Sequence, residues 1–363
     1  MEVYDLKPRH GVICSMPEDE FGYFGWPSVA RAEDGTLWAV ASGFRFWHVC
    51  PWGRTVLFKS TDNGATWSEP RVITNTPLDD RDAGIVALQG NRLAVTWFTS
   101  NTQVYRKGFE DKGFHRDRYL DEVLAKIDRA LDNISDEERW EKSGSWIRVS
   151  PDGEQWSSPR RAPVNTPHGF IVLKDGSWLY FGKKWDVQRS NFMPLDNDCI
   201  MAARSTDEGR TWESLGSVPA GDYMPQMDEP HVVELPDGRL LGAIRYEPTF
   251  SILFTESTDG GRTWSEIRNP NIAGSPPHFL LHSSGKLICS YGYRREPYGE
   301  RVAISDDLGR TWTKDFILFN GAPNGDLGYP CTVELPDGDL LTVYYQHING
   351  WDKASFLCTR WSL

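Results

Sequence analysis

The chain has 363 residues, six cysteines and a formal net charge of −12, from 39 Lys and Arg against 51 Asp and Glu. The acidic balance argues against nucleic acid as the main partner, and no apolar run is long enough to cross a membrane. Residues 1–14 lack the apolar core of a signal peptide, and the cysteines lack the paired spacing of a zinc site. We therefore expect a cytoplasmic protein with free thiols, no metal and no cofactor.

An eight-residue motif, S-x-D-x-G-x-T-W, recurs along the chain. It is complete at residues 60–67, 205–212, 257–264 and 305–312, and one residue short at 150–156. In each copy the Asp carboxylate can accept backbone N–H groups of its own turn, the Gly permits a positive φ, and the Trp can anchor the next strand. The motif is interpreted as a stapled hairpin turn that occurs once per structural unit.

The spacing of the motifs indicates one inserted segment. Their Asp residues are separated by 90, 55, 52 and 48 residues, so the first gap is too long. Within that gap, apolar residues recur at helical spacing between residues 118 and 131. Ser135, followed three residues later by Glu138, has the pattern of a helix cap. We expect a helical hairpin insertion over residues 107–142, in the second unit.

Turn signals predict six units. Strand-like runs flank tight-turn dipeptides at six places: 34–35, 90–91, 175–176, 237–238, 284–285 and 337–338. Groups of four strands at a period of about 50 residues predict an all-β, six-bladed β-propeller that forms a single domain of residues 1–363. The last unit lacks a strand, and residues 11–14 are expected to complete it and so close the ring.

Propeller topology predicts where functional side chains gather. The innermost strands begin at one end of the propeller, here called the mouth, and the second strands return to it. Residues seven to nine before each turn glycine, and seven to ten after it, should therefore surround the mouth. They include Trp26, Asp82, His168, Glu229, His278 and Tyr329 before the turns, and Arg45, Trp97, Lys183, Arg245, Arg294 and Tyr345 after them. His48 follows Arg45 on the same loop, whereas Asp79 and Asp80 are interpreted as solvated turn residues.

The repeated motif on a six-bladed propeller resembles the sialidase (neuraminidase) superfamily over nearly the whole chain. In that family a glutamate activates a tyrosine nucleophile, three arginines hold the substrate carboxylate, and an aspartate is the acid/base. Glu229 and Arg245, sixteen residues apart, match the glutamate and the second arginine, and Tyr329 matches the nucleophile. The third arginine would be Arg294 or Arg301.

The chain departs from the family pattern at three places. The family's first arginine lies in a Phe-Arg-Ile-Pro motif, for which this chain has Phe24-Gly25-Trp26-Pro27, so that arginine is missing, and Tyr345 stands where an acidic residue is expected. Between Gly35 and Thr61, where the acid/base aspartate is expected, there is no carboxylate. His48 in that place resembles the branch of the superfamily that acts on rhamnose–glucuronic acid linkages.

The resemblance implies a sialidase-like, exo-acting glycoside hydrolase that removes a terminal sugar from an acidic glycan containing sialic or uronic acid. The alternatives are a lyase or rhamnosidase for rhamnose–glucuronic acid linkages, or a glycan-binding propeller without turnover. The expected catalytic residues are Tyr329, Glu229, His48 and Asp82. Arginine and lysine suit a carboxylate, and aromatic rings suit sugar faces. The expected substrate-binding residues are accordingly Arg245, Arg294, Arg45, Lys183, His168, His278, Trp26 and Tyr345.

Three of these residues also have a purely structural interpretation. Glu229 could merely be the ion-pair partner of Arg245. Tyr329 could be a core aromatic residue with a satisfied hydroxyl group. His48 could be a loop histidine bonded to the backbone.

Overall fold

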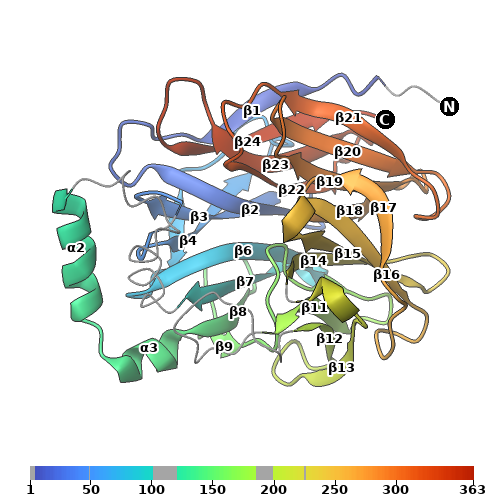
Figure 1. Cartoon of the computed structure of the whole chain (residues 1–363), viewed down its shortest axis with the longest axis horizontal. Coiled ribbons are helices and arrows are strands. Elements are labelled where there is room, and N and C mark those ends of the chain that lie inside the picture. Colours follow the sequence, from blue (N-terminus) through green and yellow to red (C-terminus); the bar gives the residue numbers. More distant parts are fainter. Residues whose placement is uncertain (1–4, 49, 101–120, 185–198, 225) are drawn as a thin grey trace.

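The computed structural model describes residues 5–48, 50–100, 121–184, 199–224 and 226–363. Within this part of the chain it has six four-stranded antiparallel sheets, arranged as a β-propeller (Figure 1). The predicted all-β, six-bladed fold is therefore confirmed.

The first three blades follow one another along the chain. Blade one is β2 (Tyr23–Arg31), β3 (Leu37–Arg45), β4 (Arg54–Ser60) and β5 (Arg71–Thr74). Blade two is β6 (Asp79–Leu88), β7 (Arg92–Ser100), β8 (Gly144–Ser150) and β9 (Arg160–Arg161). Blade three is β10 (Ile171–Val172), β11 (Trp178–Lys184), β12 (Cys199–Ser205) and β13 (Glu213–Ser217).

The last three blades complete the ring. Blade four is β14 (Met227–Glu234), β15 (Leu240–Tyr246), β16 (Ser251–Ser257) and β17 (Arg268–Ala273). Blade five is β18 (Pro277–Leu281), β19 (Leu287–Tyr293), β20 (Gly299–Ser305) and β21 (Thr313–Asn320). Blade six is β22 (Leu327–Glu334), β23 (Leu340–His347), β24 (Ala354–Trp361) and β1 (Arg9–Cys14). First strands of neighbouring blades contact each other, for example β2 with both β6 and β22, and are therefore innermost.

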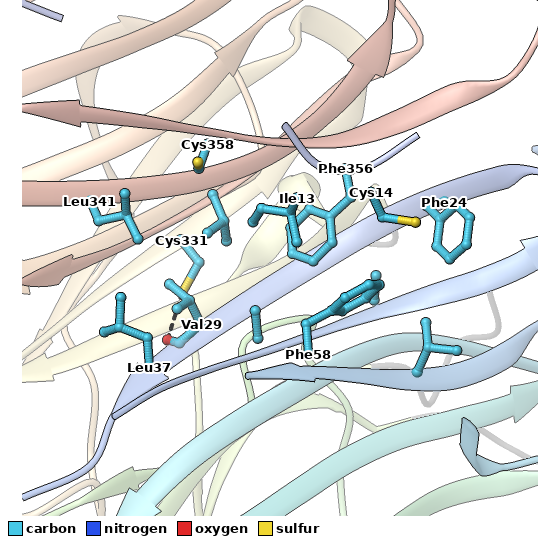
Figure 2. Close-up of a cluster of buried hydrophobic side chains, with 14 of the residues drawn as sticks. Ile13, Cys14, Phe24, Val29, Leu37, Phe58, Cys331, Leu341, Phe356 and Cys358 are labelled. Atoms are coloured by element: carbon cyan, nitrogen blue, oxygen red, sulfur yellow. Dashed lines mark hydrogen bonds between the residues drawn. The ribbon is translucent and has the colours of Figure 1, made fainter. Parts of the chain in front are cut away.

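The two ends of the chain close the ring in blade six, as predicted for residues 11–14. Strand β1 pairs antiparallel with β24, and Gly11 lies opposite Cys358. Figure 2 shows the apolar cluster between blades six and one, which includes Ile13, Phe58 and Phe356. Burial of these side chains holds the first and last blades together, because removing apolar surface from water is the main stabilising term in folding.

The recurring motif forms the predicted stapled turn. In the copy at 257–264, Asp259 accepts hydrogen bonds from the Ser257 hydroxyl at 2.8 Å, the Thr263 N–H at 2.9 Å and the Thr263 hydroxyl at 2.6 Å. The copies around Asp62, Asp207 and Asp307 make the same three bonds. Trp264 stacks on Phe181 of the preceding blade, with ring centroids 4.4 Å apart. Each motif is thus a local turn, and this one also joins two blades.

The motif carboxylates predict a pH dependence of stability. Hydrogen bonds from Thr263 and Ser257 lower the pKa of Asp259 to about 2, from an ordinary value near 4. A lowered folded-state pKa stabilises the fold above the unfolded-state pKa, and this contribution is lost as the pH falls from about 4 to 2. We therefore expect the difference in melting temperature between the wild type and Asp259→Asn to be full at pH 6 and to shrink between pH 4 and 2. Thermal melts across this range measure it, and a constant difference would contradict this origin of the stabilisation.

Two helices lie between β7 and β8, within the expected insertion. They are α2 (Asp121–Asp132) and α3 (Asp136–Lys142), and residues 107–120 of the expected segment lie outside the described residues. Ser135 caps α3 by accepting the Glu138 N–H at 3.1 Å, as its sequence pattern predicts. Among the described residues, no helix is both long and apolar enough to span a membrane.

Candidate active site at the mouth of the propeller

Four innermost strands present one residue each in the same unusual backbone conformation. Trp26, Asp82, Glu229 and Tyr329 have φ values of 52°, 50°, 48° and 55°. Each lies at a register shift between the first and second strands of its blade. A bulge of this kind redirects a side chain, and a left-handed conformation costs a non-glycine residue about 1–2 kcal/mol. Strain repeated at four equivalent positions makes the mouth the candidate functional site.

Tyr329, Glu229 and Arg245 form one hydrogen-bonded group. The Tyr329 hydroxyl donates to Glu229 Oε1, while Arg245 Nη1 donates to Glu229 Oε2 at 2.6 Å and to the Tyr329 oxygen at 3.2 Å. Arg245 Nη2 also pairs with Glu247 Oε1 at 2.6 Å. Burial, together with the charge of Glu229, raises the pKa of Tyr329 well above its usual range. The phenol is therefore protonated, with a carboxylate placed to take its proton.

Arg294, and not Arg301, lies beside this group. Its guanidinium carbon is 5.7 Å from the centroid of the Tyr329 ring. Its Nε and Nη2 atoms are buried and have no hydrogen-bond partner among the described residues. Arg301 instead donates to the carbonyls of Glu300, Phe319 and Pro297 and to the side chain of Asn320. Buried donors without partners are costly, so the Arg294 guanidinium suits an anionic ligand.

Asp82 is a buried carboxyl group near the same residues. Burial raises its pKa to about 7, and the charge of Glu229 adds to this effect while Arg81 opposes it. Asp82 Oδ1 has no hydrogen-bond partner among the described residues, and the nearest cationic atom recorded is Arg81 Nε at 4.0 Å. A carboxyl group with this pKa is partly protonated at neutral pH and can donate a proton.

His48 is held by a carboxylate that the sequence did not reveal. Its Nδ1 lies 2.8 Å from Asp326 Oδ1 and 3.2 Å from the Tyr23 hydroxyl, and its side chain is 34% exposed. Burial lowers the pKa of His48, because the opposing charge of Asp326 does not fully compensate. Asp326 is twelve residues before the turn glycine Gly338, outside the window of seven to nine residues that was searched. A window extended to the residue before β22 would have included it.

Arg45 and Trp26 lie below the mouth surface. The Arg45 guanidinium is fully buried, forms a two-bond ion pair with Asp79 and donates to the carbonyls of His48 and Cys50 at 3.1 and 3.3 Å. Trp26 is 1% exposed, and the guanidinium carbon of Arg81 lies 4.2 Å from its ring centroid. In this structure Arg45 therefore anchors the loop of His48, and Arg81, which the sequence analysis missed, covers Trp26.

The interpretation of Asp79 and Asp80 as solvated turn residues is wrong, since both are fully buried at the start of β6. Asp80 accepts hydrogen bonds from the Thr76 N–H at 2.8 Å and the Thr99 hydroxyl at 2.7 Å. Burial raises its pKa to about 7. Asp79 pairs with Arg45 of the first blade, whereas the Asp80 carboxylate is bonded at the start of its own blade, and local turn patterns reveal neither contact.

His168 and His278 do not occupy the position equivalent to Glu229. Thr166-Pro167-His168 aligns with Glu229-Pro230-His231, so the counterpart of His168 is His231. The three rings contact one another, with centroids 5.0 Å apart for His168–His278, 5.6 Å for His168–His231 and 4.4 Å for His231–His278. Burial lowers the pKa of all three, that of His231 to about 3, so they are neutral. No cluster of His, Cys, Asp or Glu in the described part of the chain could hold a metal ion.

The two remaining candidates are also buried and bonded. Lys183 pairs with Asp228, whose pKa burial raises to about 6 against the opposing effect of Lys183. The Tyr345 hydroxyl donates to Asp326 at 3.0 Å. In this structure Lys183 is thus paired with the carboxylate of Asp228, and Tyr345 is hydrogen-bonded to the Asp326 carboxylate beside His48.

The fold defines a class of proteins, the six-bladed β-propellers. The family model described as a BNR repeat-like domain matches residues 133–343, and the chain belongs to this family. No curated protein matches the chain.

Several solved structures share the fold. A protein of unknown function from Dyadobacter fermentans is similar with a TM-score of 0.75 at 21% identity, over 98% of this chain and 99% of that one. A Hadza microbial sialidase has a TM-score of 0.68 at 17% identity, over 98% and 68% of the two chains. A Penicillium chrysogenum α-L-arabinanase has a TM-score of 0.63 at 15% identity, over 96% and 97%. The predicted relation to the sialidase superfamily is confirmed for the fold.

Proposed function

We propose that this protein is an exo-acting glycoside hydrolase that removes a terminal sugar from a glycan carrying a carboxylate. The observation that carries the proposal is the pair of buried Arg294 nitrogens, Nε and Nη2, which have no hydrogen-bond partner among the described residues and lie beside the Tyr329–Glu229 pair. A carboxylate matches the fork of an arginine side chain in both charge and geometry. The sialidases and the arabinanase of the same fold support a glycan as the ligand.

In the proposed reaction, different surroundings make one residue an acid and another a base. Asp82, with a pKa raised to about 7, protonates the leaving oxygen as the glycosidic bond breaks. Tyr329, with its proton passing to Glu229, stabilises or traps the positively charged sugar carbon. His48, whose pKa is lowered, takes the proton of the water that then attacks this carbon. Any bond formed to Tyr329 breaks in this step, and Tyr329 recovers its proton from Glu229. Asp82 thus donates a proton to the leaving oxygen, and His48 accepts a proton from water.

The proposal is tested with a set of acidic oligosaccharides whose products are weighed by mass spectrometry. Hydrolysis adds the mass of one water across the bond. Binding without any product would contradict an enzymatic function and favour the glycan-binding alternative.

We expect Arg294→Lys to raise KM for the acidic substrate by about tenfold or more, because a lysine cannot form two parallel bonds to a carboxylate. Arg301→Lys is the matched control, since Arg301 is bonded to backbone carbonyls. Its KM should stay near that of the wild type even if its melting temperature falls. Equal effects of the two substitutions on KM would contradict the assignment of Arg294.

The His48–Asp326 pair favours β-elimination at a uronic acid as the second candidate. Arginines would neutralise the uronate carboxylate, and His48 would take the proton from the adjacent carbon. The product would be an unsaturated uronate that absorbs in the near ultraviolet.

The variants His48→Ala and Asp82→Asn distinguish the two roles. Under the proposed hydrolysis we expect each to lower kcat by about a hundredfold or more, the usual cost of a lost general acid or base. Elimination predicts this loss for His48→Ala, with a smaller one for Asp82→Asn. If His48→Ala retains the kcat of the wild type, His48 is only a loop residue.

A further inference from the structure

We propose that Asp326 is a positioning residue that orients His48 as a base. It holds the histidine through Nδ1 and leaves Nε2 as the nitrogen that exchanges a proton with the ligand or water. This inference rests on the proposed function, because it deepens the role of His48 in it.

The contacts of Asp326 identify it as the centre of a network from three separate segments. Its Oδ1 is 2.8 Å from His48 Nδ1 and 3.0 Å from the Tyr345 hydroxyl. Its Oδ2 is 3.0 Å from His347 Nε2, and the Tyr23 hydroxyl lies 3.0 Å from both oxygens. Four side chains thus fix the position and plane of this one carboxylate.

The chemistry of these contacts determines the tautomer of His48. An ionised carboxylate can only accept hydrogen bonds, so His48 Nδ1 must carry the proton that it donates to Asp326. In a neutral imidazole the other nitrogen, Nε2, then has the free lone pair. No hydrogen bond of His48 Nε2 is recorded among the described residues, and the side chain is partly exposed.

The surrounding charges keep this arrangement at neutral pH. Burial would raise the pKa of Asp326, but His48 and His347 lower it well below its usual range, so the carboxylate is ionised. Partial burial lowers the pKa of His48, Asp326 opposes this effect, and the charges of Arg81 and Arg294 add to it. A neutral His48 can therefore accept a proton on Nε2, and the imidazolium formed would face the charge of Asp326.

Two neighbouring tyrosines make it possible to distinguish an effect of Asp326 on His48 from an effect on the stability of the fold. Tyr344 and Tyr345 are adjacent on β23 and both buried, but the Tyr344 hydroxyl bonds Thr359 at 2.8 Å whereas the Tyr345 hydroxyl bonds Asp326. The pair Tyr345→Phe and Tyr344→Phe removes one buried hydroxyl each and differs in whether Asp326 loses a donor.

The first test is independent of any substrate and follows the ¹⁵N resonances of His48 in the full chain by NMR. In the wild type, neutral His48 should have its proton on Nδ1. Asp326→Asn should lower the pKa of His48, because a negative charge beside the ring is lost. Tyr345→Phe should raise it, because Asp326 loses a competing donor, and Tyr344→Phe should leave it unchanged. A neutral His48 protonated on Nε2, or an unchanged pKa in Asp326→Asn, would overturn the proposal.

The second test uses the best substrate of the oligosaccharide screen. Asp326→Asn should lower kcat by about a hundredfold with little change in KM, as for other groups that orient a catalytic histidine or ligand. In the His48→Ala background the same substitution should cost nothing more, since the group that it positions is gone. An equal loss in both backgrounds would show that Asp326 acts through the fold and would overturn the proposal. If the screen finds no turnover, the proposed function fails while the NMR test still decides the role of Asp326.

Discussion

Replacing Glu229 with Gln is expected to lower turnover of the acidic substrate by about 10²–10⁴-fold, the range for a lost general base. Glutamine fits the same space and can still accept a hydrogen bond from Arg245, but it cannot take the proton of Tyr329. Stability should change little, because Arg245 keeps its pairing with Glu247 at 2.6 Å. Steady-state kinetics and thermal melts on the same preparation measure both effects.

Glu247→Gln is the matched control for this experiment. Glu247 also pairs with Arg245, while the Tyr329 hydroxyl donates to Glu229 Oε1. We expect Glu247→Gln to retain most of the turnover. An equal loss in the two variants would mean that Glu229 acts only as an ion-pair partner of Arg245, which is the structural interpretation of this residue.

Replacing Trp264 with Ala is expected to cost about 3–5 kcal/mol of the free energy of unfolding, as for other buried aromatic side chains. Trp264 is 7% exposed and stacks on Phe181 at an interplanar angle of 30°, so its loss leaves a cavity between two blades. The loss should appear in chemical denaturation, while KM and kcat of the folded fraction stay near those of the wild type.

Trp67 provides the comparison for Trp264, since it stands at the same place in the first copy of the motif. It is only partly buried, so Trp67→Ala should cost less than Trp264→Ala. If Trp264→Ala left the free energy of unfolding unchanged, or if Glu229→Gln unfolded the protein, the assignment of Trp264 to stability and of Glu229 to chemistry would be wrong.

The fold could be predicted because its signals are local and repeated. The bonds of Asp259 all lie within eight residues, so the turn that they form depends on a short stretch of sequence. The same stretch recurs with a nearly constant spacing, which predicts the number of blades. The last predicted blade lacked one strand, and residues 11–14 were the strand-like segment that could supply it.

The site could be predicted only where strand length carried the information. Counting back from Gly238 and Gly338 leads to Glu229 and Tyr329, because the innermost strands have similar lengths. The count does not distinguish a residue at a bulge from one two positions later. The window therefore placed His168 together with Glu229 at the mouth, although its counterpart is His231.

The sequence by itself determined the class of fold, the closure of the ring and the end of the propeller at which titratable residues gather, because turn chemistry and periodicity act over short distances. Only the tertiary structure decided which of these residues are bonded to one another. His48 and Asp326 are 278 positions apart and meet only once the ring has closed. The same closure buries Arg45 against Asp79 and places Arg294 beside Tyr329, with Nε and Nη2 free of hydrogen bonds to the described part of the chain. Long-range contacts of this kind depend on how the blades pack, and no local pattern encodes them.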